Sequence, residues 1–499
     1  MVLRVPPRRD YGLWLAVAAA IALVVLRSIV AVRYEQNFDS DQAIVGLMAK
    51  HLSEFRAFPV FFYGQSYMLG VEAWIAVPFF WLGGPTVAML RLPLVLINIA
   101  VVVVLIVALA RRGVPPLLGL VATLPVAAAG PVTAAQLLTA LGASVEPLLY
   151  VLALWALRNR PVPFGILLCA GSLHREFTIF ALPAIVVLQW LELREIRWPA
   201  VAKAGGAFAA TWVAIDLAKK YLDVFGPGSA GSGAPASLTK EAVQVGQLLT
   251  FQPSTYLARL QLLLTQGLPD LFGARLQPLV DAGTRSALYV GSALAGGALA
   301  AAAILCAARL IWLGRGKSRS IRFQLYLALV ALQALFAYGL HGGGLEDRTE
   351  LNYILLVLLL PVAVFGAYFQ LETKTRYRWM AVLLIAVWAQ STVADDTRLV
   401  HEYLVSPPTS AHRMLADFLV SHHIKYGRAP YWDSYRVTFL ARERVVLAST
   451  ETVRIPGYQT IVDLNQSNAV TIVRAEPPCD HGTNIAAWCV SDPFKGSVR

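Results

Sequence analysis

The sequence predicts an α-helical polytopic membrane protein with about eleven transmembrane helices, followed by a small external α/β domain. Of the 499 residues, 57% are hydrophobic and only 14% are charged, and the mean hydropathy is +0.60. A chain of this composition is too apolar for a soluble protein. Apolar runs recur as far as residue 394, and beyond residue 395 they become short while charged residues become frequent.

The apolar runs have the length that crosses a bilayer, about 17 to 25 residues. They lie near 11–32, 84–110, 115–131, 134–157, 198–218, 286–313, 322–340, 351–370 and 379–394. Residues 162–191 are expected to form a hairpin broken at His174-Arg175-Glu176. The break is favoured because it places the short Lys- and Arg-rich connections on one side of the membrane, which is then the cytoplasm.

This topology predicts a membrane domain, 1–395, with a cytoplasmic N-terminus, and an external domain, 396–499. The larger external loops are 33–83 and 219–285. Within the first loop, residues 42–55 carry apolar side chains on one helical face, which is typical of a helix lying in the membrane interface.

The external domain is predicted from local signals. Thr409 or Ser410 can cap a helix that continues to about Ile424. Residues 444–448 and 469–474 are predicted strands. Cys479 and Cys489 are expected to form a disulfide if the compartment is oxidising.

Two carboxylates, Asp39 and Asp41, directly follow the first predicted span. An acid at a membrane boundary loses hydration, so its presence there indicates a partner or a function. A hydroxyl that attacks an activated sugar needs a carboxylate to take its proton, and a departing lipid phosphate needs cations or hydrogen-bond donors. The candidates on other external turns are His174, Arg175, His341 and Arg348.

Other partners and cofactors have less support. The net charge of +12 is spread over short clusters between apolar runs, so nucleic acid is not the expected partner. The four cysteines fit neither a zinc spacing nor a redox pair. No cofactor is predicted with certainty, and a divalent metal cation held by Asp39 and Asp41 stays open. We also find no Gly-rich phosphate loop after a strand, which favours a lipid-borne sugar donor.

Several segments together resemble the GT-C glycosyltransferases, and among them the protein O-mannosyltransferases and lipid A aminoarabinose transferases. They are FDSDQAIVGLMAKHL, FYGQSYMLG, WLGGPTVAMLRLP and LLCAGSLHREFTIFALP. The resemblance covers residues 11–192. It implies the GT-C fold and an inverting transferase in the cytoplasmic (inner) membrane. Such an enzyme takes a sugar from a polyprenyl-phosphate donor on the external face and passes it to a protein, lipid or glycan acceptor.

The resemblance also implies roles for individual residues. The family's base, the Asp of an Asp-Glu pair, falls on Asp41, and Gln42 replaces the Glu. Asp39, two residues earlier, is then the candidate for the part of the missing Glu as the catalytic partner of Asp41. The aminoarabinose enzymes carry Glu-Lys where this chain has Gly64-Gln65, so Gln65 is left to donate a hydrogen bond to the lipid phosphate. Arg348 resembles the family's phosphate-binding Arg.

Simpler interpretations remain open for most of these residues. Asp39 and Asp41 could be N-caps of the helix that follows. Arg175 could pair with Glu176, and Arg348 with its acidic neighbours. Tyr63 fits an interfacial aromatic belt as well as a sugar site. Glu146 is either a second acceptor-site carboxylate or an ordinary boundary residue.

Two other classes of protein compete with an enzyme. A transporter or flippase of lipid-linked sugars should carry paired charges near the membrane centre and internal repeats. A structural or sensory protein would work through the tail, 396–499. The sequence leaves the sugar, the acceptor and the oligomeric state undetermined.

Overall fold

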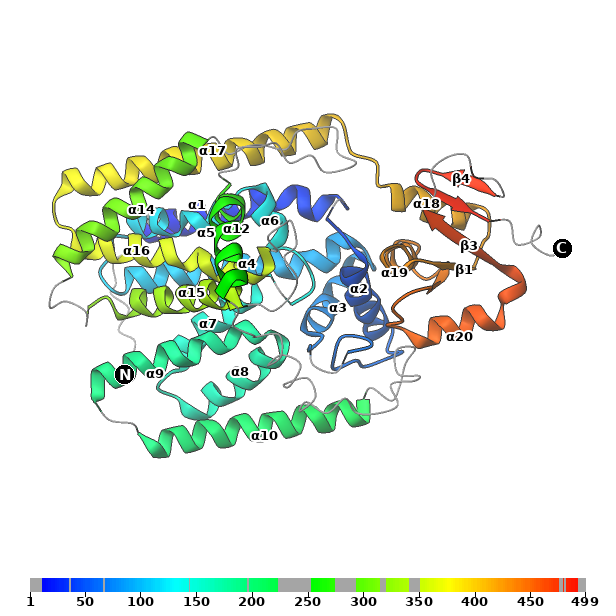
Figure 1. Cartoon of the computed structure of the whole chain (residues 1–499), viewed down its shortest axis with the longest axis horizontal. Coiled ribbons are helices and arrows are strands. Elements are labelled where there is room, and N and C mark those ends of the chain that lie inside the picture. Colours follow the sequence, from blue (N-terminus) through cyan, green and yellow to red (C-terminus); the bar gives the residue numbers. More distant parts are fainter. Residues whose placement is uncertain are drawn as a thin grey trace.

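The computed structural model describes residues 11–35, 37–65, 68–142, 144–194, 197–222, 253–273, 293–314, 320–340, 351–474, 479 and 482–491. Figure 1 shows a bundle of helices with a small mixed domain at one end. Helices α2 (Ser40–Ser53) and α3 (Val71–Gly83) lie between the bundle and that domain.

The bundle is built from helices of very different lengths. Its longer members are α1 (Tyr11–Arg33), α4 (Val87–Ala110), α5 (Pro116–Ala127), α7 (Glu146–Leu157), α8 (Pro161–His174), α9 (Ala181–Leu193), α10 (Trp198–Leu222), α14 (Ala293–Leu313), α15 (Arg322–Leu340), α16 (Leu359–Leu371) and α17 (Thr375–Val405). Its shorter members are α6 (Pro131–Gln136), η1 (Glu176–Phe180), α12 (Pro253–Leu262), η2 (Leu263–Gly267), α13 (Leu268–Leu271), η3 (Leu351–Tyr353) and η4 (Leu355–Leu358).

Five of the described helices are long and apolar enough to cross a bilayer, and shorter apolar helices accompany them. The protein is therefore a multi-pass membrane protein.

The expected break in 162–191 is present. Helix α8 ends at His174, Arg175 is extended (φ −151°, ψ 126°), and α9 begins at Ala181 after the turn η1. The single span expected over 134–157 is wrong, because α6 ends at Gln136 and α7 begins only at Glu146. Gly142 in this connection has φ +71°, and a Cβ on it would lie 2.9 Å from His174 Nε2. The non-helical connection between α6 and α7 therefore lies against His174 at the tip of the α8–α9 hairpin.

Helix α2 is confirmed, but its polar side is covered by protein and is not exposed to water. Apart from the half-buried Asp41, every residue from Ser40 to Leu52 is buried, including the polar Gln42 and Lys50. Phe55, expected on the apolar face, is 69% exposed. The polar side of α2 faces the C-terminal domain instead of water, and this packing brings Asp41 against that domain.

The C-terminal domain is a small sheet with helices packed on it. Its elements are α18 (Ala411–Ser421), β1 (Tyr426–Ala429), α19 (Tyr431–Leu440), β2 (Val446–Ser449), α20 (Pro456–Leu464), η5 (Gln466–Asn468), β3 (Ala469–Arg474), β4 (Thr483–Ile485) and β5 (Trp488–Val490). The strand order is β2-β1-β3-β5-β4. Strand β1 pairs parallel with β2 and β3, and β5 is antiparallel to β3 and β4.

The local predictions for this domain are confirmed. Ser410 caps α18 by accepting a hydrogen bond from the Arg413 amide at 3.2 Å. The two predicted strands are β2 and β3, and Cys479 is bonded to Cys489. Helix α19 packs on α2, where the Phe439 ring would lie 2.5 Å from a Cβ placed on Gly46. The glycine thus permits the close approach of the two helices.

Candidate active site

The two aspartates before and within α2 have different surroundings. Asp39 is the N-cap of the helix, and its carboxylate accepts a hydrogen bond from the Gln42 amide at 2.9 Å. Asp41 lies in the first turn and accepts a hydrogen bond from the hydroxyl of Tyr431, the first residue of α19. Helix capping therefore accounts for Asp39. It does not account for Asp41, whose carboxylate contacts the C-terminal domain instead.

The environment of Asp41 favours a basic carboxylate. Burial raises its pKa above the ordinary 3.8, while the hydrogen bond from Tyr431 acts in the opposite direction. The charge of Asp39 also raises this pKa, and the charges of Arg454 and Arg175 lower it. The net shift is upward. Asp41 is thus a stronger base than an exposed aspartate, with two cations close enough to influence it.

Arg454 comes from the segment between β2 and α20 and reaches the Gly64-Gln65 turn. Its guanidinium donates to the Gly64 carbonyl at 3.2 Å. With the Gln65 amide oriented to satisfy its neighbours, its oxygen accepts from both terminal nitrogens of Arg454, at 3.1 and 3.2 Å. Gly64 has φ +69°, and a Cβ on it would lie 3.0 Å from the Arg454 Cα. Glycine is therefore needed here both for the turn and for the contact.

Arg175 approaches the same carboxylate from the tip of the α8–α9 hairpin. Its nearest acid is Glu176, but the closest atoms are 3.9 Å apart and the Glu176 side chain is 56% exposed. An ion pair of this kind contributes little. The Nε atoms of Arg175 and Arg454 are both buried without a hydrogen-bond partner among the described residues. The charges of both guanidiniums act on Asp41, so this part of the protein is a candidate site for an anion.

His174 lies next to this site but is held by protein groups on both sides. Its Nε2 is 3.0 Å from the Glu72 carboxylate, and its Nδ1 is 2.8 Å from the Tyr150 hydroxyl. Both His174 and Glu72 are buried. Their contact ties the hairpin tip to α3, so the structure gives His174 the surroundings of a supporting residue for Arg175.

Glu146 is a buried member of the same region. One of its oxygens accepts from the Ser144 hydroxyl at 2.9 Å, and the other has no hydrogen-bond partner among the described residues. It is therefore not an ordinary exposed boundary residue. Glu72 is a site residue that was not predicted from the sequence. A lone acid in the apolar segment VEAWIAVPFF was the available signal.

Tyr63 belongs to the contact between α2 and the C-terminal domain. Its hydroxyl is 2.9 Å from His51 Nδ1, and His51 Nε2 is 2.9 Å from the Glu443 carboxylate. Lys50 and Tyr458 also donate to Glu443, at 2.6 and 2.7 Å. We call His51, Tyr63, Glu443, Tyr458 and Lys50 the α2 junction. It fixes α2, and with it Asp41, against the domain.

Three predictions are not tested by this arrangement. His341 and Arg348 lie outside the described residues. Within the described ranges, no three His, Cys, Asp or Glu side chains gather as metal ligands. A divalent cation at Asp39 and Asp41 stays a prediction.

Comparison with solved structures confirms the fold predicted from the sequence. The chain is similar to the crystal structure of ArnT from Cupriavidus metallidurans bound to undecaprenyl phosphate, with a TM-score of 0.55 over 98% of this chain and 99% of that chain. The apo structure of the same protein gives a TM-score of 0.54 over 96% and 97%. The identity is 11% in both cases, so the likeness concerns the fold. No protein-family model and no curated protein matches the sequence.

Proposed function

We propose that this protein is an inverting membrane glycosyltransferase. It takes a sugar from a polyprenyl-phosphate donor and transfers it to an acceptor at the external face of the cytoplasmic membrane. The observation that carries the proposal is a half-buried Asp41 with a raised pKa, on which the charges of two arginines from separate parts of the chain, Arg175 and Arg454, act. The fold supports it, because ArnT, which shares the fold, was crystallised with undecaprenyl phosphate.

In the proposed reaction, one group accepts the hydroxyl proton and two others stabilise the leaving phosphate. The acceptor hydroxyl attacks the anomeric carbon on the face opposite the phosphate. The bond from that carbon to the phosphate oxygen breaks, and polyprenyl phosphate leaves with the electron pair. Asp41 takes the hydroxyl proton, for which its raised pKa suits it. Arg175 and Arg454 stabilise the negative charge that grows on the phosphate.

Arg454 supplies the cation that the first loop lacks at Gln65. The aminoarabinose enzymes, which the sequence resembles, place a lysine where this chain has Gln65. Here the Arg454 guanidinium lies at Gln65 and supplies a cation at the same turn. We propose that Gln65 orients Arg454 toward the lipid phosphate, with Arg348 as a further candidate cation.

The test is transfer from a radiolabelled polyprenyl-phosphate sugar in membranes. Asp41→Asn should lower the rate by at least about 100-fold, the usual contribution of a general base. Asp463→Asn is the matched control, because this exposed carboxylate pairs with Arg428 outside the proposed site, so activity should stay within a few-fold. Full activity of Asp41→Asn would remove Asp41 from the mechanism.

The same preparation separates transfer from transport. A transferase releases polyprenyl phosphate in step with glycosylated product. A flippase moves labelled lipid across proteoliposomes with its sugar–phosphate bond intact, and that result in the absence of cleavage would overturn the proposal.

A further inference from the structure

A cavity lined by arginines and aromatic rings lies far from Asp41. It has a volume of about 220 Å³ and is bounded by the ends of α4, α7, α9 and α15. The length of helix α4 gives the separation between the cavity and the region of Asp41. Arg91, near its start, donates to the carbonyl of Asn37 at 2.8 Å, beside α2. Arg112 follows its other end, after 24 helical residues or about 36 Å. The cavity is thus at the opposite end of the bundle, which the charge pattern predicts to face the cytoplasm.

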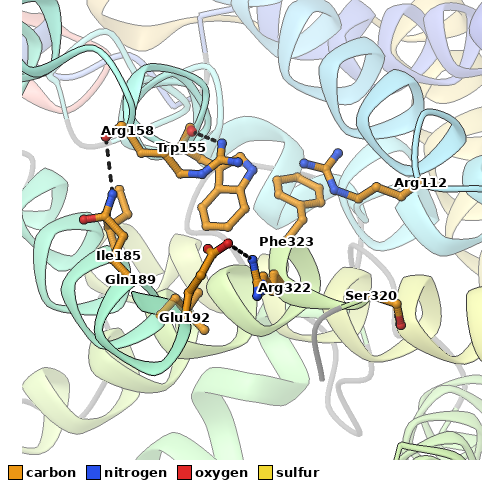
Figure 2. Close-up of a pocket in the computed structure, with 10 residues that line it drawn as sticks. Arg112, Trp155, Arg158, Ile185, Gln189, Glu192, Ser320, Arg322 and Phe323 are labelled. Atoms are coloured by element: carbon orange, nitrogen blue, oxygen red, sulfur yellow. Dashed lines mark hydrogen bonds and ion pairs between the residues drawn. The ribbon is translucent and has the colours of Figure 1, made fainter. Parts of the chain in front are cut away.

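Two of the guanidiniums lie on aromatic rings. The Arg112 guanidinium carbon is 4.3 Å from the Phe323 ring centroid, and that of Arg158 is 4.1 Å from the Trp155 ring centroid. Figure 2 shows both pairs, and the Trp155 and Phe323 rings between the two arginines. A stacked guanidinium keeps its N–H groups in the plane of the fork, where they can bind an anion.

The positive charge in the cavity is only partly balanced. Arg322 is paired with Glu192 at 2.5 Å, and Figure 2 shows this contact on one wall. Arg112 and Arg158 donate instead to backbone carbonyls, those of Ala108 at 2.5 Å and Trp155 at 2.7 Å. Among the described residues, neither has a carboxylate at ion-pair distance. Burial and the charges of Arg158 and Arg111 lower the pKa of Arg112 to about 10. Burial also lowers the pKa of Arg158, against the opposing charge of Glu192.

We propose that this cavity binds the phosphate of an anionic phospholipid from the membrane leaflet at that end of the bundle. In this proposal Arg112 and Arg158 donate to the phosphodiester oxygens, and Trp155 and Phe323 line the cavity beside them. The cavity is smaller than the roughly 300 to 1,000 Å³ of drug-sized sites, which suits a headgroup. Basic pockets between helices at the cytoplasmic face are typical headgroup sites.

A lipid is favoured over a free phosphate by the apolar side of the cavity. Ile185 and Leu188 of α9 line it beside the arginines. Trp190 and Leu191, which follow on the same helix, are about half exposed, at 49% and 53%, as on a lipid-facing surface. Acyl chains can therefore continue from the cavity along α9, whereas a small anion would make no use of this side.

The test uses the purified full chain in a neutral detergent. Phosphatidylglycerol is titrated and bound lipid is counted by native mass spectrometry, with phosphatidylcholine of the same acyl chains as the zwitterionic reference. The wild type should bind phosphatidylglycerol at least about tenfold more tightly, the factor expected from one charge-assisted hydrogen bond. Equal binding of the two lipids would overturn the proposal without use of any variant.

Variants then locate the site. Arg112→Gln with Arg158→Gln should remove the preference for phosphatidylglycerol, and Arg158→Lys should keep part of it because the charge remains. Arg376→Gln is the matched control. This exposed arginine is at the start of α17, and its guanidinium lies against Tyr377. An unchanged preference in the double variant would refute the site. Competition by inorganic phosphate or glycerol 3-phosphate as strong as that by the lipid would refute the lipid assignment.

Discussion

The hydrogen bond from Tyr431 to Asp41 gives a prediction about the pH dependence of transfer. The bond favours the carboxylate form of Asp41, so it holds the pKa of this group below the value that burial alone would give. Tyr431→Phe removes the donor and keeps the ring. The pKa of Asp41 should then rise, and the acid limb of the rate profile should move to higher pH.

The size of the shift can be worked out. A hydrogen bond to a charged group contributes about 1.5 kcal/mol, and one pKa unit corresponds to about 1.4 kcal/mol. The acid limb should therefore move up by about one unit. Above both midpoints Asp41 is ionised in either protein, and a slightly stronger base should keep the plateau rate within a few-fold.

Single-turnover transfer measured from pH 4 to about pH 8 isolates the chemical step. Tyr34→Phe is the control, because the Tyr34 hydroxyl donates to the Tyr403 carbonyl at 2.7 Å and has no part in the site. Its profile should match the wild type. An acid limb that stays in place in Tyr431→Phe, or moves to lower pH, would show that Asp41 is not the titrating base.

Three further variants test the surroundings of Asp41. Arg454→Gln should lower kcat/KM for the lipid donor about tenfold or more, whereas Arg428→Gln, which loses only an exposed pair with Asp463, should leave it unchanged. In transfer assays, Arg175→Lys should also lose about tenfold, while Glu176→Gln should have no effect, given their 3.9 Å separation. Glu443→Gln should destabilise the protein by about 3 kcal/mol in thermal unfolding, because Lys50 and His51 lose their buried partner.

Glu443 also predicts how stability depends on pH. Burial alone would raise its pKa, but hydrogen bonds from His51, Lys50 and Tyr458 outweigh burial and hold the pKa well below the ordinary 4.5. A carboxylate of this kind stabilises the fold above pH 4.5 and loses its contribution as the pH falls below that value. Wild-type melting temperature should drop with pH in this range more steeply than that of Glu443→Gln.

Much of the fold was predictable because its signals are local. The hairpin break at His174-Arg175-Glu176 follows from charges inside an apolar run, and the Ser410 cap from a hydroxyl before a periodic segment. The error over 134–157 has a physical cause. Nearly all side chains there are apolar, so hydropathy cannot detect a connection whose path is set by the contact of Gly142 with His174.

The composition of the site could not be predicted for a different reason. The sequence indicated Asp41 and Arg175, which stand out as charges beside apolar spans. Tyr431 and Arg454 lie in a domain where polar residues are ordinary, and each meets its partner in the first loop across 390 residues of sequence. Contacts of this range depend on how the domain docks on α2, and a single sequence carries no local sign of that docking.

The docking also changes how the role of the tail must be tested. Deletion of residues 396–499 does not separate a catalytic first loop from a working tail. The structure shows that α17 continues to Val405 and that the domain covers the buried polar side of α2. Deletion would therefore expose Lys50 and His51 and remove Tyr431 and Arg454 together. A catalytic loop would then fail along with a sensory tail, so only point variants that leave the α2 junction intact, such as Tyr431→Phe, can distinguish the two.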